Sequence, residues 1–170
     1  MHMRDGLRGE LPAEVLAHYD LGDVRAIEKH GGTAAGNWRV ETDRGAWLLR
    51  TRGARTSTDD AIAFDHALRR HLVSRGLPTA APIEGLDGET FTRVADRVFE
   101  VYPFIAGRPS TAASDAQLQS AARGLARLHR AVESFPQARI AARVAQYGTL
   151  GIPDTSEDVA EIGRLGDLTL

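Results

Sequence analysis

The early part of the chain alternates between apolar and polar residues. In "NWRVET", residues 37–42, Trp38 and Val40 alternate with charged neighbours, which is the period of a half-buried strand. The run "VRAIEKH" before this segment is interpreted as a first strand, and the short, more fully apolar run "AWLLR" follows it after the turn signal Asp-Arg-Gly. The pattern predicts three strands, over residues 24–30, 37–42 and 46–50.

Two later segments repeat apolar residues at helical spacing. The first follows a cap at Ser57 or Thr58, continues to about Ser74 and ends before Gly76. Its predicted apolar face comprises Ala61, Phe64, Leu68 and Leu72. The second begins at the capping box formed by Ser114 and Gln117. Its predicted face comprises Leu118, Ala121, Leu125, Leu128 and Val132, and weaker helices are expected over residues 12–19, 138–147 and 156–168.

The segment between these two helices contains hairpin and turn signals. Asp87-Gly88 is a strong hairpin turn, and strands are predicted near 90–94 and 97–101. Pro103 cannot donate to a ladder, so the sheet should end before it and "YPFIAGRP" should be a connector. The layout predicts an α+β protein in which a β-rich domain, residues 1–106, precedes a helical one, residues 107–170.

Composition narrows the functional classes. The net charge of −2 argues against binding of nucleic acid through phosphate neutralisation. The chain has no cysteine, which excludes disulfides and thiol chemistry. No apolar run approaches the length of about 18 residues that a membrane span needs, and the first residues show no apolar signal-peptide core. We therefore expect a cytoplasmic protein that binds neither membranes nor nucleic acid.

The run "HGGTAAGNWRV", residues 30–40, is rich in small residues and contains the only asparagine of the chain. One interpretation is a flexible hairpin loop between two strands. The other is a loop whose backbone N–H groups approach an anion such as a phosphate. The loop alone does not decide between them.

Four stretches in order resemble one protein family: "GGTAAGNWRVETDRGAWLLR", "FDHALRRHLVSRGLPTAAPI", "VYPFIAGRP" and "LARLHRA". Together they resemble the small-molecule kinases of the aminoglycoside phosphotransferase, homoserine kinase and choline kinase group. The resemblance implies a protein-kinase-like N-lobe, with an antiparallel sheet and one helix, followed by the first helices of an α-helical C-lobe. It also implies ATP, with Mg²⁺ in complete members, and a small-molecule hydroxyl acceptor.

The resemblance assigns nucleotide-binding roles to individual positions. Arg50, on the third strand, would face the α- and β-phosphates in place of the usual lysine. Asp65 falls near the helix acid that pairs with that cation, but its shorter side chain puts direct contact with Arg50 in doubt. The loop residues that would cover the phosphates are Gly31, Gly32, Thr33, Gly36 and Asn37.

The resemblance also places a hinge between the lobes at residues 102–105. In such hinges one backbone carbonyl and one backbone N–H two residues later bind adenine. Pro103 retains its carbonyl, and Ile105 would supply the N–H. Tyr102 would limit the depth of the adenine pocket.

A complete kinase of this kind needs an aspartate for the acceptor hydroxyl and, five residues later, an asparagine that holds magnesium. Asn37 is the only asparagine, so no such motif follows the hinge. "RLGDLTL" resembles the corresponding family stretch only through Gly-Asp-Leu, and Asp167 is interpreted as a surface acid. We therefore assign no catalytic and no metal-binding residue. We expect a truncated ATP lobe without turnover of its own, with a missing C-terminal half or a partner chain as complement.

Two alternatives stay open at this point. The chain is a kinase-like module that binds a nucleotide or a partner protein without catalysis, or it is an unrelated α+β domain with a coincidental glycine loop. Structure discriminates the last from the others, because a kinase-like lobe folds its first hairpin over a cleft.

Overall fold

The computed structural model describes residues 13–31, 36–108, 112–136 and 139, and the predicted helices at 138–147 and 156–168 lie outside this part apart from residue 139. The chain divides into two compact units, Met1–Phe135 and Pro136–Leu170. The first contains every helix and strand considered below: α1 (Ala13–Leu16), β1 (Val24–His30), β2 (Asn37–Thr42), β3 (Gly45–Thr51), the 3₁₀ turn η2 (Ala54–Thr56), α2 (Asp59–Ser74), β4 (Thr92–Val94), β5 (Arg97–Pro103) and α3 (Asp115–Glu133). A division into lobes at residue 107 stays a prediction.

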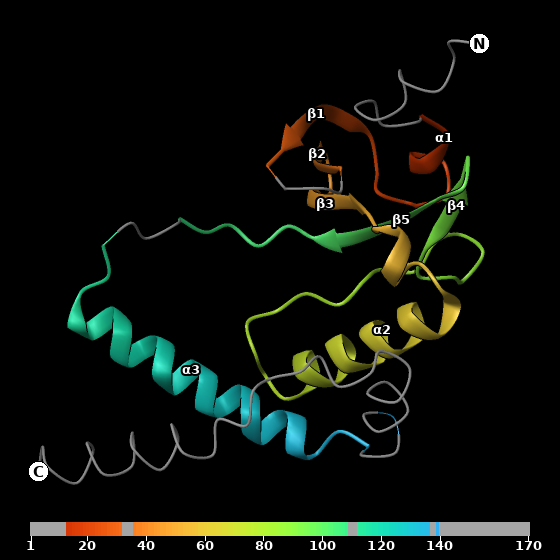
Figure 1. Ribbon diagram of the computed structural model, residues 1–170. Coiled ribbons are helices and arrows are strands. Elements are labelled where there is room, and N and C mark those ends of the chain that lie inside the picture. Colours follow the sequence, from red (N-terminus) through yellow and green to blue (C-terminus); the bar gives the residue numbers. More distant parts are fainter. Residues whose placement is uncertain (1–12, 32–35, 109–111, 137–138, 140–170) are drawn as a thin grey trace, which may run out of the picture. The chain divides into compact units, whose positions relative to one another are not determined.

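The five strands form one antiparallel sheet in the order β1-β2-β3-β5-β4 (Figure 1). The predicted bounds of β1 and β2 are confirmed, and β3 is one residue longer at each end than predicted. Ala95 and Asp96 connect β4 to β5 with φ of 47° and 62°, as a two-residue type I′ turn requires. The turn at Asp87-Gly88 exists, but it joins two loop segments and not two strands.

The prediction that the sheet ends before Pro103 is wrong. Backbone N–H groups of Arg52 and Phe104 donate to the carbonyls of Val98 and Ala46 at 3.0 Å, so the even-numbered residues of β5 bond to β3. Hydrogen bonding in an antiparallel strand alternates between its two edges. Pro103 therefore faces the edge away from β3, beyond the last pair with β4, where its missing N–H interrupts no ladder bond.

One face of the sheet carries the apolar core. Alternate residues of the three central strands point to this face, and α1 with the segment after it covers them. Tyr19 lies close to Phe99 here, with its hydroxyl 3.5 Å from the Phe99 carbonyl. The buried members are Val15, Tyr19, Leu21, Trp38, Val40, Leu49, Phe99 and Val101.

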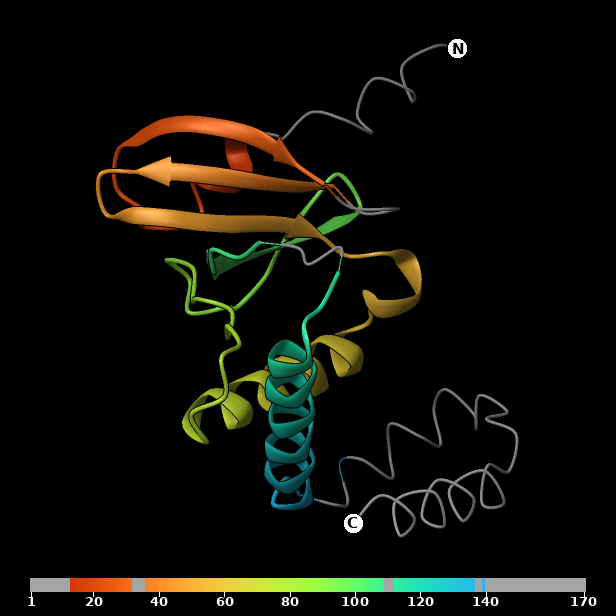
Figure 2. The same ribbon diagram turned by 90° about the vertical axis from the view of Figure 1, so that its left-hand side faces the viewer.

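Helix α2 crosses below the opposite face of the sheet (Figure 2). Thr58 caps it, because its hydroxyl accepts a hydrogen bond from the Ala61 backbone N–H at 3.3 Å. The predicted apolar stripe of α2 is directed in part toward the residues that follow α3, since the rings of Phe64 and Phe135 lie 5.8 Å apart. The residues of α2 that are fully buried are Ala61, Ile62 and His66.

Helix α3 begins at the predicted capping box, which is confirmed: Ser114 N–H donates to the Gln117 side chain at 2.8 Å, and Gln117 N–H to the Ser114 hydroxyl at 3.4 Å. Its last turns contact the end of α2, where Arg127 donates to the Gly76 carbonyl at 2.9 Å. Leu118 and Leu125 remain 56% and 53% exposed. In the part of the chain described above, no helix combines the length and the apolarity needed to cross a membrane.

Candidate functional site

A pocket of about 270 Å³ lies where the end of β1, the middle of β3 and the end of β5 meet the segment after α2. Four of the residues predicted from the sequence line it, namely Arg50, Tyr102, Pro103 and Ile105. The pocket thus brings the predicted hinge and the predicted strand cation to one place. The remaining lining residues are His30, Leu48, Arg69, Pro78, Thr79, Ala80 and Phe104.

The two ends of the glycine loop are held together. The Asn37 side-chain amide donates to the Gly31 carbonyl at 2.9 Å. The Gly36 N–H donates to the Thr51 hydroxyl and the Thr51 N–H donates to the Gly36 carbonyl, each at 2.8 Å. A Cβ on Gly36 would collide with the ring of Trp38, whereas one on Gly31 would meet open space. Asn37 therefore closes the loop, whose predicted members Gly32 and Thr33 lie outside the described residues.

The backbone at the end of β5 is directed toward the pocket. On the edge away from β3, the Val101 carbonyl accepts from the Ile83 N–H at 2.9 Å. Pro103 has the same strand parity, so its carbonyl points to this edge as well. No ladder partner from β4 lies opposite Pro103. The carbonyl is thus placed to accept a hydrogen bond from a molecule in the pocket.

Tyr102 is fixed in the pocket wall from several directions. Its hydroxyl donates to Glu100 Oε2 at 2.9 Å, and the Arg69 guanidinium lies 5.2 Å over its ring. The His66 ring meets it edge-on, with 6.5 Å between centroids. Burial, and then the negative charge of Glu100, raise the pKa of Tyr102, so the phenol keeps its proton and donates at neutral pH.

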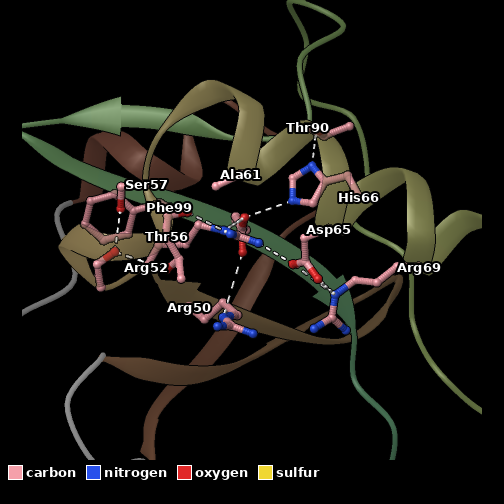
Figure 3. Close-up of polar contacts among 12 residues, drawn as sticks. Arg50, Arg52, Thr56, Ser57, Ala61, Asp65, His66, Arg69, Thr90 and Phe99 are labelled. Atoms are coloured by element: carbon pink, nitrogen blue, oxygen red, sulfur yellow. Dashed lines mark hydrogen bonds and ion pairs between the residues drawn. The ribbon is translucent and has the colours of Figure 1, made fainter. Parts of the chain in front are cut away.

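Glu100 is fully buried and is the centre of a charged network (Figure 3). Its Oε1 accepts from Arg52 Nε and, at 2.8 Å, from His66 Nε2. Burial alone would raise the pKa of Glu100, but the hydrogen bond from His66 and the charge of Arg52 outweigh burial and lower it. An ionised carboxylate only accepts, so His66 Nε2 carries a hydrogen, and Nδ1 lies 2.7 Å from the Thr90 hydroxyl.

The helix acid Asp65 pairs with Arg52 and Arg69, whereas its direct contact with Arg50 was left in doubt by the sequence. It forms an ion pair with Arg52 and accepts from Arg69 Nε at 3.2 Å to both oxygens. Arg50 lies instead across from Glu100, with Nε 3.8 Å from Oε2. That Nε is buried and has no hydrogen-bond partner among the residues that the structure describes. The structure therefore pairs Asp65 with Arg52, two residues beyond the predicted cation.

Sequence reasoning missed four members of this network: Arg52, His66, Arg69 and Glu100. One signal was available for Glu100, which stands alone as an acid within the apolar run "VFEVY". A carboxylate at such a position has to be paired when the strand is buried. His66 gave no comparable signal, because a single histidine on a helix is common.

The fold and the site define the class of protein. A five-stranded antiparallel sheet is crossed by one helix, and a pocket lies at the end of β5, the strand that leads toward α3. This arrangement is that of a kinase-like N-lobe. The family described as "Phosphotransferase enzyme family" matches residues 24–151, and the chain belongs to this family.

The curated relatives include a homoserine kinase of Hyphomonas neptunium (strain ATCC 15444), 32% identical over 127 residues. The match covers 74% of this chain and 38% of that enzyme. The chain thus spans about two fifths of the length of this relative.

Solved structures support the fold. A spectinomycin phosphotransferase in complex with ADP and spectinomycin matches with a TM-score of 0.56 and 18% identity, over 72% of this chain and 36% of that one. An amicoumacin kinase in complex with AMP-PNP, Ca²⁺ and Ami matches with a TM-score of 0.57 and 15% identity, over 74% of this chain and 44% of that one. The predicted kinase-like fold is confirmed.

Proposed function

We propose that the pocket at the end of β5 binds ATP, and that this chain supplies the nucleotide-binding part of a phosphotransferase acting on a small-molecule hydroxyl group. One observation carries the proposal: a single pocket is lined by the free backbone edge of the hinge and by the strand arginine Arg50. The first group suits a nucleobase and the second suits phosphate.

The hinge end of the pocket supports adenine binding. Adenine presents a donor and an acceptor on one edge, which the Pro103 carbonyl and the Ile105 N–H would match. Leu48 and Tyr102 supply an apolar and an aromatic wall. The fixed position of Tyr102 limits how deep the base can enter.

The other end supports phosphate binding by its charge. The network holds three guanidinium groups, of Arg50, Arg52 and Arg69, against two carboxylates, of Asp65 and Glu100. Arg52 contacts both carboxylates directly, so Arg50 has only a longer ion pair with Glu100, at 3.8 Å. An anion in the pocket would balance this excess positive charge. The closed ends of the glycine loop, at Gly31 and Gly36, would place its backbone over the phosphates.

Two structural neighbours support the class of ligand, because one is a complex with ADP and the other with AMP-PNP. In complete phosphotransferases Mg²⁺ neutralises charge on the transferred phosphoryl group, and the acceptor hydroxyl is oriented by an aspartate. We assign no residue of this chain to either role. Turnover by these 170 residues alone is therefore not expected, and nucleotide binding is the activity to test.

Calorimetric titration of the chain with ATP, ADP and adenosine tests the proposal. We expect saturable binding of ATP, weakened about tenfold or more in Arg50→Gln, since a charge-assisted contact is lost. Arg44→Gln is the matched control, because Arg44 pairs with Asp20 at an exposed turn and not in the pocket. Failure of the folded chain to bind ATP, or equal losses in both variants, would contradict the proposal.

A further inference from the structure

Arg69 is a second guanidinium in the pocket, and it comes from a different element than Arg50. Both residues line the same space, and their side chains are 29% and 33% exposed. In Figure 3 the guanidinium groups of Arg50 and Arg69 lie lower in the view than Asp65, and that of Arg52 lies to the left of Asp65. Two cations facing one space repel each other unless an anion lies between them.

Each of the two arginines is held by one carboxylate. Asp65 accepts from Arg69 Nε at 3.2 Å, and Glu100 lies 3.8 Å from Arg50 Nε. These contacts involve Nε, and within the part of the chain that the structure describes no hydrogen bond engages the terminal nitrogens of either arginine. The guanidinium of Arg69 is further oriented by the ring of Tyr102. Both side chains are thus positioned with donors to spare.

Arg52 connects the two carboxylates. It donates to Glu100 through Nε and to Asp65 through a terminal nitrogen, and its other terminal nitrogen donates to the Thr56 carbonyl at 2.8 Å. Its side chain is only 4% exposed, so it contributes no surface for a ligand. The order is therefore one buried arginine, then two carboxylates, then two arginines at the pocket.

We infer that Arg50 and Arg69 together bind the phosphate chain of the nucleotide, one from the sheet and one from α2, and that Arg52 is a positioning residue for both. The inference rests on the proposed function and adds a residue to it. A guanidinium provides planar, paired donors that match phosphate oxygens. The ligand class is a nucleoside di- or triphosphate, because its successive phosphates offer oxygens to a guanidinium from each of two elements.

An ordinary structural role for Arg69 makes a different prediction. A residue at position i+4 from an aspartate commonly stabilises the helix surface. If Arg69 only supported Asp65 and Tyr102, its removal would disturb the whole pocket, and adenosine and ATP would weaken alike. If Arg69 contacts the phosphates, the loss of affinity in an Arg69 variant should increase with the number of phosphates on the ligand.

The test measures the dissociation constants of ATP, ADP, AMP and adenosine for the 170-residue chain at one ionic strength. In Arg69→Gln we expect about a tenfold loss for ATP, a smaller loss for ADP, and a change within about twofold for adenosine. Arg70→Gln is the matched control, because Arg70 is the next residue on α2 and pairs with Glu84 at 3.0 Å outside the pocket. It should bind all four ligands like the unaltered chain.

Arg69→Lys covers the case in which the glutamine variant does not fold. Lysine keeps the charge but cannot hold Asp65 and donate forked hydrogen bonds at once, so ATP should weaken about threefold or more with adenosine unchanged. ATP binding retained in Arg69 variants but lost in Arg50→Gln would overturn this inference and leave the proposed function standing. Equal losses for ATP and adenosine would also overturn it. A chain that binds no ATP at all would overturn both.

Discussion

Phe99 and Glu100 are consecutive residues of β5, and both are fully buried, yet they belong to opposite faces of the sheet. Phe99 packs in the apolar core with α1, whereas Glu100 accepts from Arg52, His66 and Tyr102 on the face toward α2. One face is stabilised by removal of apolar surface from water. The other contains buried charges that are tolerated only because each is paired.

The difference shows how one sheet serves two purposes. Removal of apolar surface from water holds the strands together and has no preferred direction. Hydrogen bonds between ions are directional, and the charged face uses one to hold Arg69 at the pocket, whereas Arg50 lies there as the ion-pair partner of Glu100. Substitutions on the two faces should therefore differ in how the free energy of unfolding depends on pH and in how much they weaken ligand binding, even when they destabilise the fold by similar amounts.

The largest effect is expected from removing either buried side chain. Phe99→Ala should lower the free energy of unfolding by about 3–5 kcal/mol through lost burial and a cavity. Glu100→Ala should cost about 3–5 kcal/mol because it leaves Arg52 buried without its main partner. Urea denaturation followed by circular dichroism measures both. A cost below about 1 kcal/mol for Glu100→Ala would show that the charged face is not stabilised by pairing.

Two buried tyrosines offer a finer comparison. Tyr102→Phe removes a 2.9 Å hydrogen bond to an ionised carboxylate and should cost about 1.5–3 kcal/mol. Tyr19→Phe removes a long contact of 3.5 Å to the Phe99 carbonyl and should cost less than about 0.5 kcal/mol. Urea midpoints at pH 7 give both values. Equal costs would mean that the network around Glu100 adds nothing to an ordinary hydroxyl contact.

The free energy of unfolding should depend on acid pH differently for substitutions on the two faces of the sheet. The pKa of Glu100 is lowered in the folded chain, so the folded state binds fewer protons than the unfolded state. Its contribution is complete above the unfolded pKa of about 4.3 and is lost as pH falls toward the folded value. Below about pH 4 one such group adds up to about 1.4 kcal/mol per pH unit to the slope.

One substitution on each face shows whether the slope comes from Glu100. Phe99→Ala should give a curve of unfolding free energy against pH that is parallel to the unaltered one and lower throughout. Glu100→Gln cannot titrate and should give a shallower curve between about pH 4 and 3. Parallel curves for all three proteins would mean that Glu100 carries no share of the acid sensitivity.

Much of this arrangement could be predicted where local rules decide it. The strand at residues 37–42 follows from period-two alternation, and the caps at Ser57 or Thr58 and at Ser114 follow from side-chain chemistry, with Thr58 the residue that caps α2 in the structure. The likeness of four short motifs to known kinases supplied the fold class, and it placed Arg50 in the pocket.

The ion-pair partners could not be predicted in the same way. Arg50 and Arg52 are two residues apart, so they face the same side of the sheet, and alternation does not say which of them reaches Asp65. That choice depends on how α2 crosses the sheet, which is a property of tertiary packing. Pro103 was misjudged for a related reason, because its acceptability in β5 depends on which edge its missing N–H faces.

The most direct test of the central claim uses two neighbouring leucines of β3. Leu48 lines the pocket and Leu49 is buried in the apolar core on the other face. In a methyl-labelled sample, addition of ATP should shift the NMR signals of the Leu48 methyl groups and leave those of Leu49 nearly unchanged. In Arg50→Gln the Leu48 methyl signals should shift only at higher ATP concentrations. Equal shifts of both leucines, or a shift of neither at saturating ATP, would contradict a nucleotide site on the charged face.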